Sequence, residues 1–169
     1  EGLARLQPVT RDKGGAITAG NAPGLNDGGA ALVLMSGERV KASGAKPLAR
    51  VVAYATGGGE PKDLFFAPID AVQKLMKKMG VSIGDFDLIE ANEAFAAQAL
   101  ANGLALGWDW DRVNVNGGAV ALGHPIGASG ARVLVTLLHA LEHHGKKTGL
   151  ATLCLGGGNA VALAVERVG

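Results

Sequence analysis

The chain has 169 residues, 27 of them glycine, and its 16 basic and 15 acidic side chains leave a formal charge of +1. This length favours one domain with a small appendage, and the balanced charge argues against binding of nucleic acid or of an anionic membrane surface. The apolar runs are too short to span a bilayer, and a single cysteine excludes an internal disulfide and a cysteine-based structural zinc site, so we expect a soluble, cytoplasmic protein.

The amino-terminal segment, Glu1 to Asp27, is polar and is interrupted by proline and glycine, so we expect a loop. No initiator methionine or targeting sequence precedes it, and we therefore expect a processed chain or a part of a longer one. Ala30 to Met35 is a short apolar run that predicts a buried strand. Gly37 to Ala42 predicts a short helix, and Leu48 to Ala55 predicts a second strand.

The middle of the chain contains the clearest helical pattern. Pro68 suits a first helical turn, apolar residues follow at helical spacing, and Gly80 suits the end of the helix. Leu88 to Ala91 then predicts a strand. Asn92 is a candidate N-cap for an alanine-rich helix from Ala94 to Leu106, with Glu93 in its first turn.

The last third begins with a predicted strand at Val113 to Val115. Ala131 to His144 predicts a helix that is apolar on nearly every face and therefore buried. Two apolar strands, Leu150 to Leu155 and Ala160 to Val165, are joined by GGGN, which suits a hairpin connection.

Strands and helices alternate from Leu48 onward, which is typical of an α/β fold. We expect a mixed, mainly parallel five-stranded sheet that is covered by helices and closed by one antiparallel strand. Ligands of such sheets bind beyond the carboxyl ends of the strands, where Asn92, His124 and Cys154 all fall in the predicted order.

His124 lies in a glycine-rich run, GGAVALGHPIGASG, from Gly117 to Gly130. Pro125 restrains the backbone on one side, and the glycines leave room for a substrate. Histidine moves protons near neutral pH, so His124 is a candidate catalytic residue, although a structural loop role is equally compatible with this pattern. The run lacks a GKS or GKT ending and the GxGxxG spacing of nucleotide-binding loops, which leaves nucleotide binding a weak alternative.

Cys154 ends a strand and opens into three glycines, an arrangement that can expose a thiol for nucleophilic or proton-transfer chemistry. The alternative is a small buried hydrophobic residue. In an isolated NEAFA segment, Asn92 is better explained as an N-cap. Together with a neutral His124, however, its amide could bind a water molecule or a carbonyl oxygen that gains negative charge.

Four motifs occur in order along the chain: TAGNAPGLNDG from Thr18 to Gly28, NEAFA from Asn92, GGAVALGHPIGASGAR from Gly117, and CLGGG from Cys154. Together they closely resemble the thiolase family, in particular its acetyl-CoA acetyltransferases. The resemblance covers essentially the whole chain. It implies a thiolase-type domain that joins two acetyl-CoA molecules into acetoacetyl-CoA and free CoA, or catalyses the reverse thiolysis, through an acyl-cysteine intermediate.

The resemblance also implies roles for individual residues. Cys154 matches the family's acid/base cysteine, whereas the nucleophilic cysteine belongs to an amino-terminal motif that this chain does not contain. His124 and Asn92 match the residues of one oxyanion hole, in which the asparagine holds a water molecule. Gly156 matches the backbone donor of a second oxyanion hole.

Substrate contacts follow from the same resemblance. Ala94 and Phe95 match positions that line the pantetheine tunnel, and Ala19 and Pro23 lie in the segment that matches the end of the CoA-binding loop. Pro23 stands where many relatives carry serine, so the CoA contact made there is expected to differ. We expect a coenzyme A thioester as substrate, no permanently bound cofactor and no metal.

The implied domain organisation places residues 1–45 at the end of an amino-terminal half and residues 46–169 in a thiolase carboxyl-terminal domain. The expected partners are acetyl-CoA or acetoacetyl-CoA, the missing amino-terminal half, and further copies of the protein in a homo-oligomer. We expect the isolated chain to be inactive. Two alternatives stay open: a 3-ketoacyl-CoA thiolase with a broader chain-length range, and a noncatalytic scaffold or interaction fragment.

Overall fold

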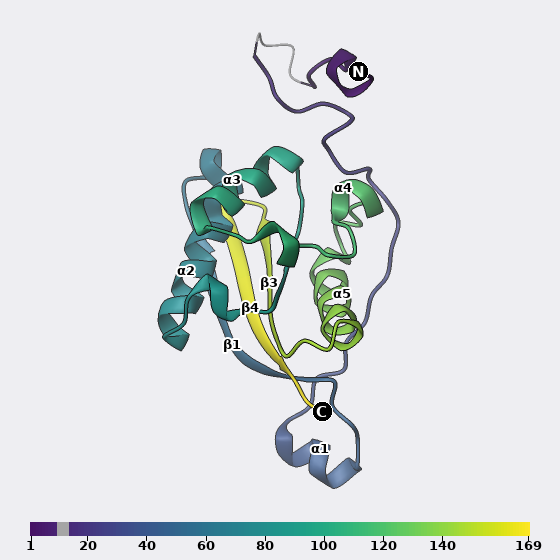
Figure 1. Ribbon diagram of the computed structural model, residues 1–169, viewed down its shortest axis with the longest axis vertical. Coiled ribbons are helices and arrows are strands. Elements are labelled where there is room, and N and C mark those ends of the chain that lie inside the picture. The colour runs from purple at the N-terminus through teal and green to yellow at the C-terminus, as the bar shows by residue number, and fades with distance from the viewer. Residues whose placement is uncertain (10–13) are drawn as a thin grey trace.

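The computed structural model describes residues 1–9 and 14–169 (Figure 1). The described part of the predicted amino-terminal loop contains a short 3-10 turn at Leu3–Arg5 and isolated bridges at Pro8, Thr18 and Leu25. Residues 10–13 lie outside the described residues. Helix α1 (Gly37–Ser43) confirms the predicted short helix. In Figure 1 the chain that directly precedes α1 passes along the outer side of α5 (Ser129–His143).

The strand predicted at Ala30 to Met35 is wrong, because this run forms no strand pairing. Val33 and Leu34 are 84% and 74% exposed. An extended segment becomes a strand only through hydrogen bonds to a neighbouring strand, and none of the strands in residues 1–9 and 14–169 pairs with this run.

Four strands form one sheet: β1 (Ala49–Gly58), β2 (Leu88–Ala91), β3 (Thr148–Leu155) and β4 (Asn159–Arg167). Their order is β1-β4-β3-β2. The predicted hairpin of β3 and β4 is confirmed, with Leu155 opposite Asn159. Because β4 lies between β3 and β1, it makes two antiparallel pairings, and the β2–β3 pairing alone is parallel.

This arrangement corrects the prediction of a mainly parallel five-stranded sheet. β1, β2 and β3 do run in the same direction, but the antiparallel β4 separates β1 from the other two. The fifth predicted strand, at Val113 to Val115, is reduced to one isolated bridge between Val113 and Ile89, after which Asn114 takes a positive φ of 49° that no strand permits.

Helices cover both faces of the sheet (Figure 1). α2 (Ala67–Met79) and α5 (Ser129–His143) confirm two predicted helices, and α3 (Ala96–Leu106) begins two residues later than expected because Phe95, and not Asn92, is its N-cap. α5 buries one face, while most of its other residues are half-buried, so it is less enclosed than its composition suggests. The short helix α4 (Ala119–Leu122) lies between α3 and α5 in the sequence.

Alternate residues of β2, β3 and β4 contribute to two separate cores on the two faces of the sheet. Leu150 packs on the α2 side with Val72 and Leu75, whereas its neighbour Ala151 packs on the α5 side with Leu137. This period of two is that of a strand buried on both faces. The result is a three-layer domain whose strands end at the edge where the candidate site residues lie.

A glycine in β1 allows α2 to approach the sheet closely. A Cβ built on Gly57 would lie 2.4 Å from the Ala71 nitrogen and 2.7 Å from the Ala67 oxygen, and neither backbone atom can move alone. We therefore expect Gly57→Ala to lower the free energy of unfolding by about 1–3 kcal/mol, as overpacking does. Urea unfolding followed by circular dichroism measures this, and Gly59→Ala is the matched control because no atom lies within 4 Å of its Cβ position.

Candidate active site

The loop that carries His124 is docked against the amino-terminal segment. The His124 N–H donates to the Gly24 carbonyl at 3.0 Å, and Leu25 forms an isolated bridge with His124. Gly123 has φ of 97° and ψ of 162°, a backbone conformation that residues with a side chain rarely adopt. The backbone of His124 is thereby fixed from both sides.

The His124 ring is oriented by the first turn of α5. Nδ1 lies 2.6 Å from the hydroxyl oxygen of Ser129, which is buried and itself donates to the Pro125 carbonyl at 2.9 Å. Burial, and then the positive charge of Arg132, lower the pKa of His124 below its usual value. His124 is therefore neutral at physiological pH.

Asn92 follows β2 directly and contacts His124. Its backbone N–H donates to the Thr152 carbonyl at 2.9 Å, which extends the pairing of β2 and β3 by one residue. The side chain is buried, and its Nδ2 lies 3.4 Å from Nε2 of His124. Two candidate residues that are 32 positions apart in the sequence thus meet at the end of β2.

Glu93 was expected in the first turn of α3, but it stabilises a different helix. Its Oε2 accepts from the N–H of Val120 in α4 at 2.8 Å, and its Oε1 accepts from Asn114 Nδ2 at 3.1 Å. Asn114 also exchanges two hydrogen bonds of 2.9 Å with the backbone of Ala91. Glu93 and Asn114, which sequence reasoning assigned no such role, tie the glycine-rich loop to the end of β2.

Cys154 lies near the end of β3, opposite Ala160, on the sheet face that packs against α2. The thiol is half-buried, and burial raises its pKa above the usual value, so the resting group is protonated. Gly156 is exposed in the hairpin loop, where its carbonyl accepts from Asn159 Nδ2 at 3.4 Å. Cys154 and Asn92 thus lie at the same carboxyl edge of the sheet. They lie on opposite faces of it, because Cys154 is on the α2 side and Asn92 is on the α5 side.

The predicted CoA-contacting residues lie in two segments that are connected by a backbone hydrogen bond. The Ala96 N–H donates to the Asn21 carbonyl at 2.9 Å, which connects the NEAFA region to the Thr18–Gly28 segment. Ala94 N–H donates to Gln98 Oε1 at 3.0 Å, and the rings of Phe95 and Phe65 meet edge to face at 5.2 Å. Of the two residues predicted in the loop, Ala19 is exposed and Pro23 is half-buried.

Sequence reasoning missed a buried charged pair next to Asn92. Glu90 is 1% exposed, and its Oε2 lies 3.8 Å from Nη1 of Arg132, while Nη2 of the same guanidinium donates to Asn92 Oδ1 at 3.5 Å. Burial raises the pKa of Glu90 to about 7, against the opposing effect of Arg132. An acidic residue within the apolar strand LIEA was the signal for this pair.

The raised pKa of Glu90 predicts a pH-dependent stability. Between pH 4.5 and about 7 the unfolded chain has released this proton while the folded chain keeps it, so the free energy of unfolding falls as the pH rises. We expect Glu90→Gln to remove this component, which amounts to roughly 3 kcal/mol across the window. Urea unfolding at a series of pH values measures the difference, and Glu38→Gln on exposed α1 should retain the slope of the original chain.

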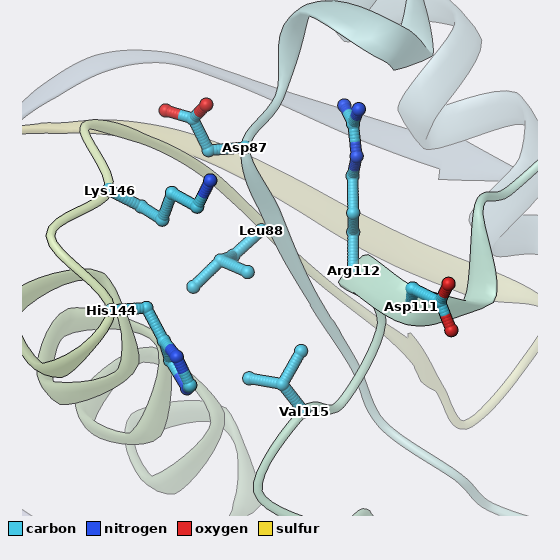
Figure 2. A pocket seen from close by; sticks show the side chains of 7 residues that line it. All are labelled: Asp87, Leu88, Asp111, Arg112, Val115, His144 and Lys146. Carbon is cyan, nitrogen blue, oxygen red and sulfur yellow. The ribbon is translucent and has the colours of Figure 1, made fainter.

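A pocket of about 310 Å³ lies at the far end of α5 (Figure 2). Leu88 and Val115 line it between charged side chains, but Arg112 is paired with Asp109 at 3.1 Å, and Asp87 accepts from the Thr148 N–H at 2.8 Å. His144 lies at the carboxyl end of α5, and Ser129 begins the helix next to His124. A helix of this length is about 22 Å long, which separates the pocket from His124. This pocket is therefore separate from the site at Asn92 and His124.

The structure thus defines a three-layer α/β domain with a glycine-rich loop folded over the end of its parallel strand pair. Within residues 1–9 and 14–169, no helix has both the length and the apolar character that a membrane crossing requires. The model of the thiolase C-terminal domain matches residues 45–167, and the model of the thiolase N-terminal domain matches residues 1–38. The chain belongs to the thiolase family.

Individual relatives agree with this assignment. The chain is 58% identical over 167 residues to an acetyl-CoA acetyltransferase of Chromobacterium violaceum and 56% identical to one of Escherichia coli, with 99% of the chain covered in each case. The crystal structure of the Bacillus anthracis acetyl-CoA acetyltransferase superposes with a TM-score of 0.95 at 51% identity over 99% of the chain. An Ascaris suum thiolase in complex with coenzyme A gives a TM-score of 0.90 at 44% identity over 98%. The chain spans 42% of the length of both curated relatives and 42% and 43% of the two solved chains.

Proposed function

We propose that this chain contributes the acid/base and oxyanion-binding part of an acetyl-CoA acetyltransferase, which converts two acetyl-CoA molecules into acetoacetyl-CoA and CoA and catalyses the reverse thiolysis. The observation that carries the proposal is the contact of Asn92 Nδ2 with His124 Nε2, at 3.4 Å, in a chain whose relatives of 56–58% identity are acetyl-CoA acetyltransferases. Residues 1–45 belong to the end of the amino-terminal half and residues 46–169 to the carboxyl-terminal domain.

The chemistry requires a carbanion equivalent at the methyl carbon of a thioester. A base must remove a proton from this carbon while hydrogen-bond donors stabilise the charge that develops on the carbonyl oxygen. Asn92 and His124 bind that oxygen, directly or through a water molecule. Cys154 transfers the proton to and from the carbon or the leaving thiol, and the Gly156 N–H contributes to a second oxyanion hole.

Substrate binding involves the two joined segments. Ala94 and Phe95 line the pantetheine arm of the coenzyme A thioester, and Ala19 and Pro23 contact its nucleotide end. The Ascaris suum thiolase in complex with coenzyme A supports this class of ligand, and the Ala96–Asn21 hydrogen bond supports a common site for both segments.

A complete catalytic cycle requires a second cysteine that accepts the acetyl group, and Cys154 is the single cysteine of this chain. The partner that supplies the nucleophile is the amino-terminal half of a thiolase, and the assembled enzyme is a cytoplasmic homo-oligomer. The exposed Val33 and Leu34 support this proposal, because a strand-forming apolar segment is stable only when it is paired and covered.

The proposal is tested by intact mass measurement of the purified chain, followed by an acetoacetyl-CoA thiolysis assay on the same sample. We expect no turnover from the chain alone, and turnover when it replaces the equivalent part of the Escherichia coli relative. That turnover should be lost in the same chimera with Cys154→Ser. An inactive but folded chimera would favour the scaffold alternative, preference for longer ketoacyl-CoA substrates would favour the broader thiolase, and turnover by the lone chain would overturn the role of Cys154.

A further inference from the structure

Arg132 connects the buried end of β2 to the candidate site. Glu90 and Asn92 are two residues apart, and the side chains of both reach the same guanidinium group on α5. Nη1 lies 3.8 Å from Glu90 Oε2 and donates to Thr136 Oγ1 at 3.5 Å, while Nη2 donates to Asn92 Oδ1 at 3.5 Å. These contacts hold the guanidinium group beside the amide of Asn92.

The guanidinium group has no acceptor, and this decides the orientation of the amide. The atom of Asn92 that faces Arg132 must be the oxygen, so the NH₂ group faces His124. Nε2 of His124 then accepts the hydrogen bond from Asn92 Nδ2 and carries no proton itself. In a neutral imidazole the proton must therefore lie on Nδ1.

The other side of the ring requires the same arrangement. Ser129 Oγ donates its single proton to the Pro125 carbonyl, so it can only accept from His124 Nδ1, which lies 2.6 Å away. All donors consequently point in one direction, from Arg132 through Asn92 and His124 to Ser129 and the Pro125 carbonyl. Two independent partners, one at each ring nitrogen, select the same tautomer.

We propose that Arg132 is a positioning residue that fixes the direction of this hydrogen-bond chain and thereby holds resting His124 as the Nδ1–H tautomer, with Nε2 as a proton acceptor. The role of this tautomer in catalysis rests on the proposed function, whereas the tautomer itself does not. Glu90 and Thr136 both lie against Nη1 of this guanidinium, on the side away from Asn92 Oδ1. In this state the lone pair of Nε2 accepts from Asn92 Nδ2, and Nε2 becomes a donor to a substrate oxygen only after it has gained a proton.

The tautomer can be measured without substrate. The chain is labelled with ¹⁵N-histidine, and long-range ¹H–¹⁵N spectra distinguish a protonated, pyrrole-type nitrogen from an unprotonated, pyridine-type nitrogen. His124→Gln assigns the signals of His124 among the four histidines. We expect a pyridine-type Nε2 and a pyrrole-type Nδ1 in the original chain.

Variants of Arg132 test the cause. The double variant Arg132→Met with Glu90→Gln removes the guanidinium without leaving a buried unpaired carboxylate, and it should change the ratio of the two tautomers about tenfold or more. Arg132→Lys retains a donor-only cation and should keep the original spectrum. Arg50→Met is the control, because Arg50 pairs with Glu166 on the sheet edge away from α5.

The possible outcomes separate the two proposals. A pyrrole-type Nε2 in the original chain, which needs no variant to fold, would overturn the inference. An unchanged tautomer in a folded double variant, or an effect of equal size in Arg50→Met, would also overturn it. If the tautomer is as expected but the chimeric enzyme is inactive, the inference about Arg132 stands and the proposed acyl transfer fails.

Discussion

Replacing His124 by alanine is expected to slow acetoacetyl-CoA thiolysis by about 10²- to 10⁴-fold in a complete enzyme that contains this chain. The imidazole is neutral, fixed by Ser129 and in contact with Asn92, so its loss removes both a proton carrier and one side of the oxyanion site. Steady-state thiolysis of acetoacetyl-CoA in the chimeric enzyme measures the effect. Because the group acts on the transition state, we expect the loss mainly in kcat.

The matched control is His143→Ala at the exposed end of α5. It removes the same kind of side chain at the opposite end of α5, away from the site, and it should leave the rate within about twofold because such surface substitutions change stability by less than ~0.5 kcal/mol. Near-normal turnover of the His124→Ala enzyme would refute the role of His124. Equal losses in both variants would point to a general effect on folding.

The largest effect on stability is expected from Leu137→Ala. Leu137 is fully buried in α5, and its methyl groups pack so closely on β3 that a Cβ built on Gly149 would lie 2.9 Å from them. Truncation removes apolar contacts and leaves a cavity that the glycine cannot fill, at a cost of about 2–5 kcal/mol. This is a large fraction of the ~5–15 kcal/mol that stabilises a typical domain.

Urea unfolding followed by circular dichroism measures this loss. Leu104→Ala is the matched control, since Leu104 lies on α3 and is 81% exposed, and it should change the free energy of unfolding by less than ~0.5 kcal/mol. A loss below about 1 kcal/mol for Leu137→Ala would mean that α5 settles onto Gly149 after truncation.

The helices are predictable from the sequence where local patterns are sufficient. In α2, apolar spacing and the flanking Pro68 and Gly80 define the helix without reference to its neighbours. The strand order is different, because a hairpin turn places β4 beside β3 but does not determine that β4 also pairs with β1. The run Ala30 to Met35 has the composition of a strand, but composition provides no pairing partner.

The same distinction applies to the site. Asn92 and His124 were expected at the carboxyl edge of the sheet, and the structure brings them into contact. The supporting residues were not foreseen, although Glu90 in an apolar strand and Arg132 in an apolar helix were both visible. A charged residue at a buried position requires a partner, but the sequence does not show which residue that partner is.

The position of β4 between β3 and β1 has a consequence for synthesis of the protein. β1 is complete at residue 58, but the strand that pairs with it spans residues 159–167. At a translation rate of ~5–20 residues per second, β1 waits about 5–20 s for its partner. During this interval the growing chain exposes an unpaired strand to the chaperones and other nascent chains around the ribosome. The yield of folded protein should therefore depend on how quickly residues 59–167 are translated.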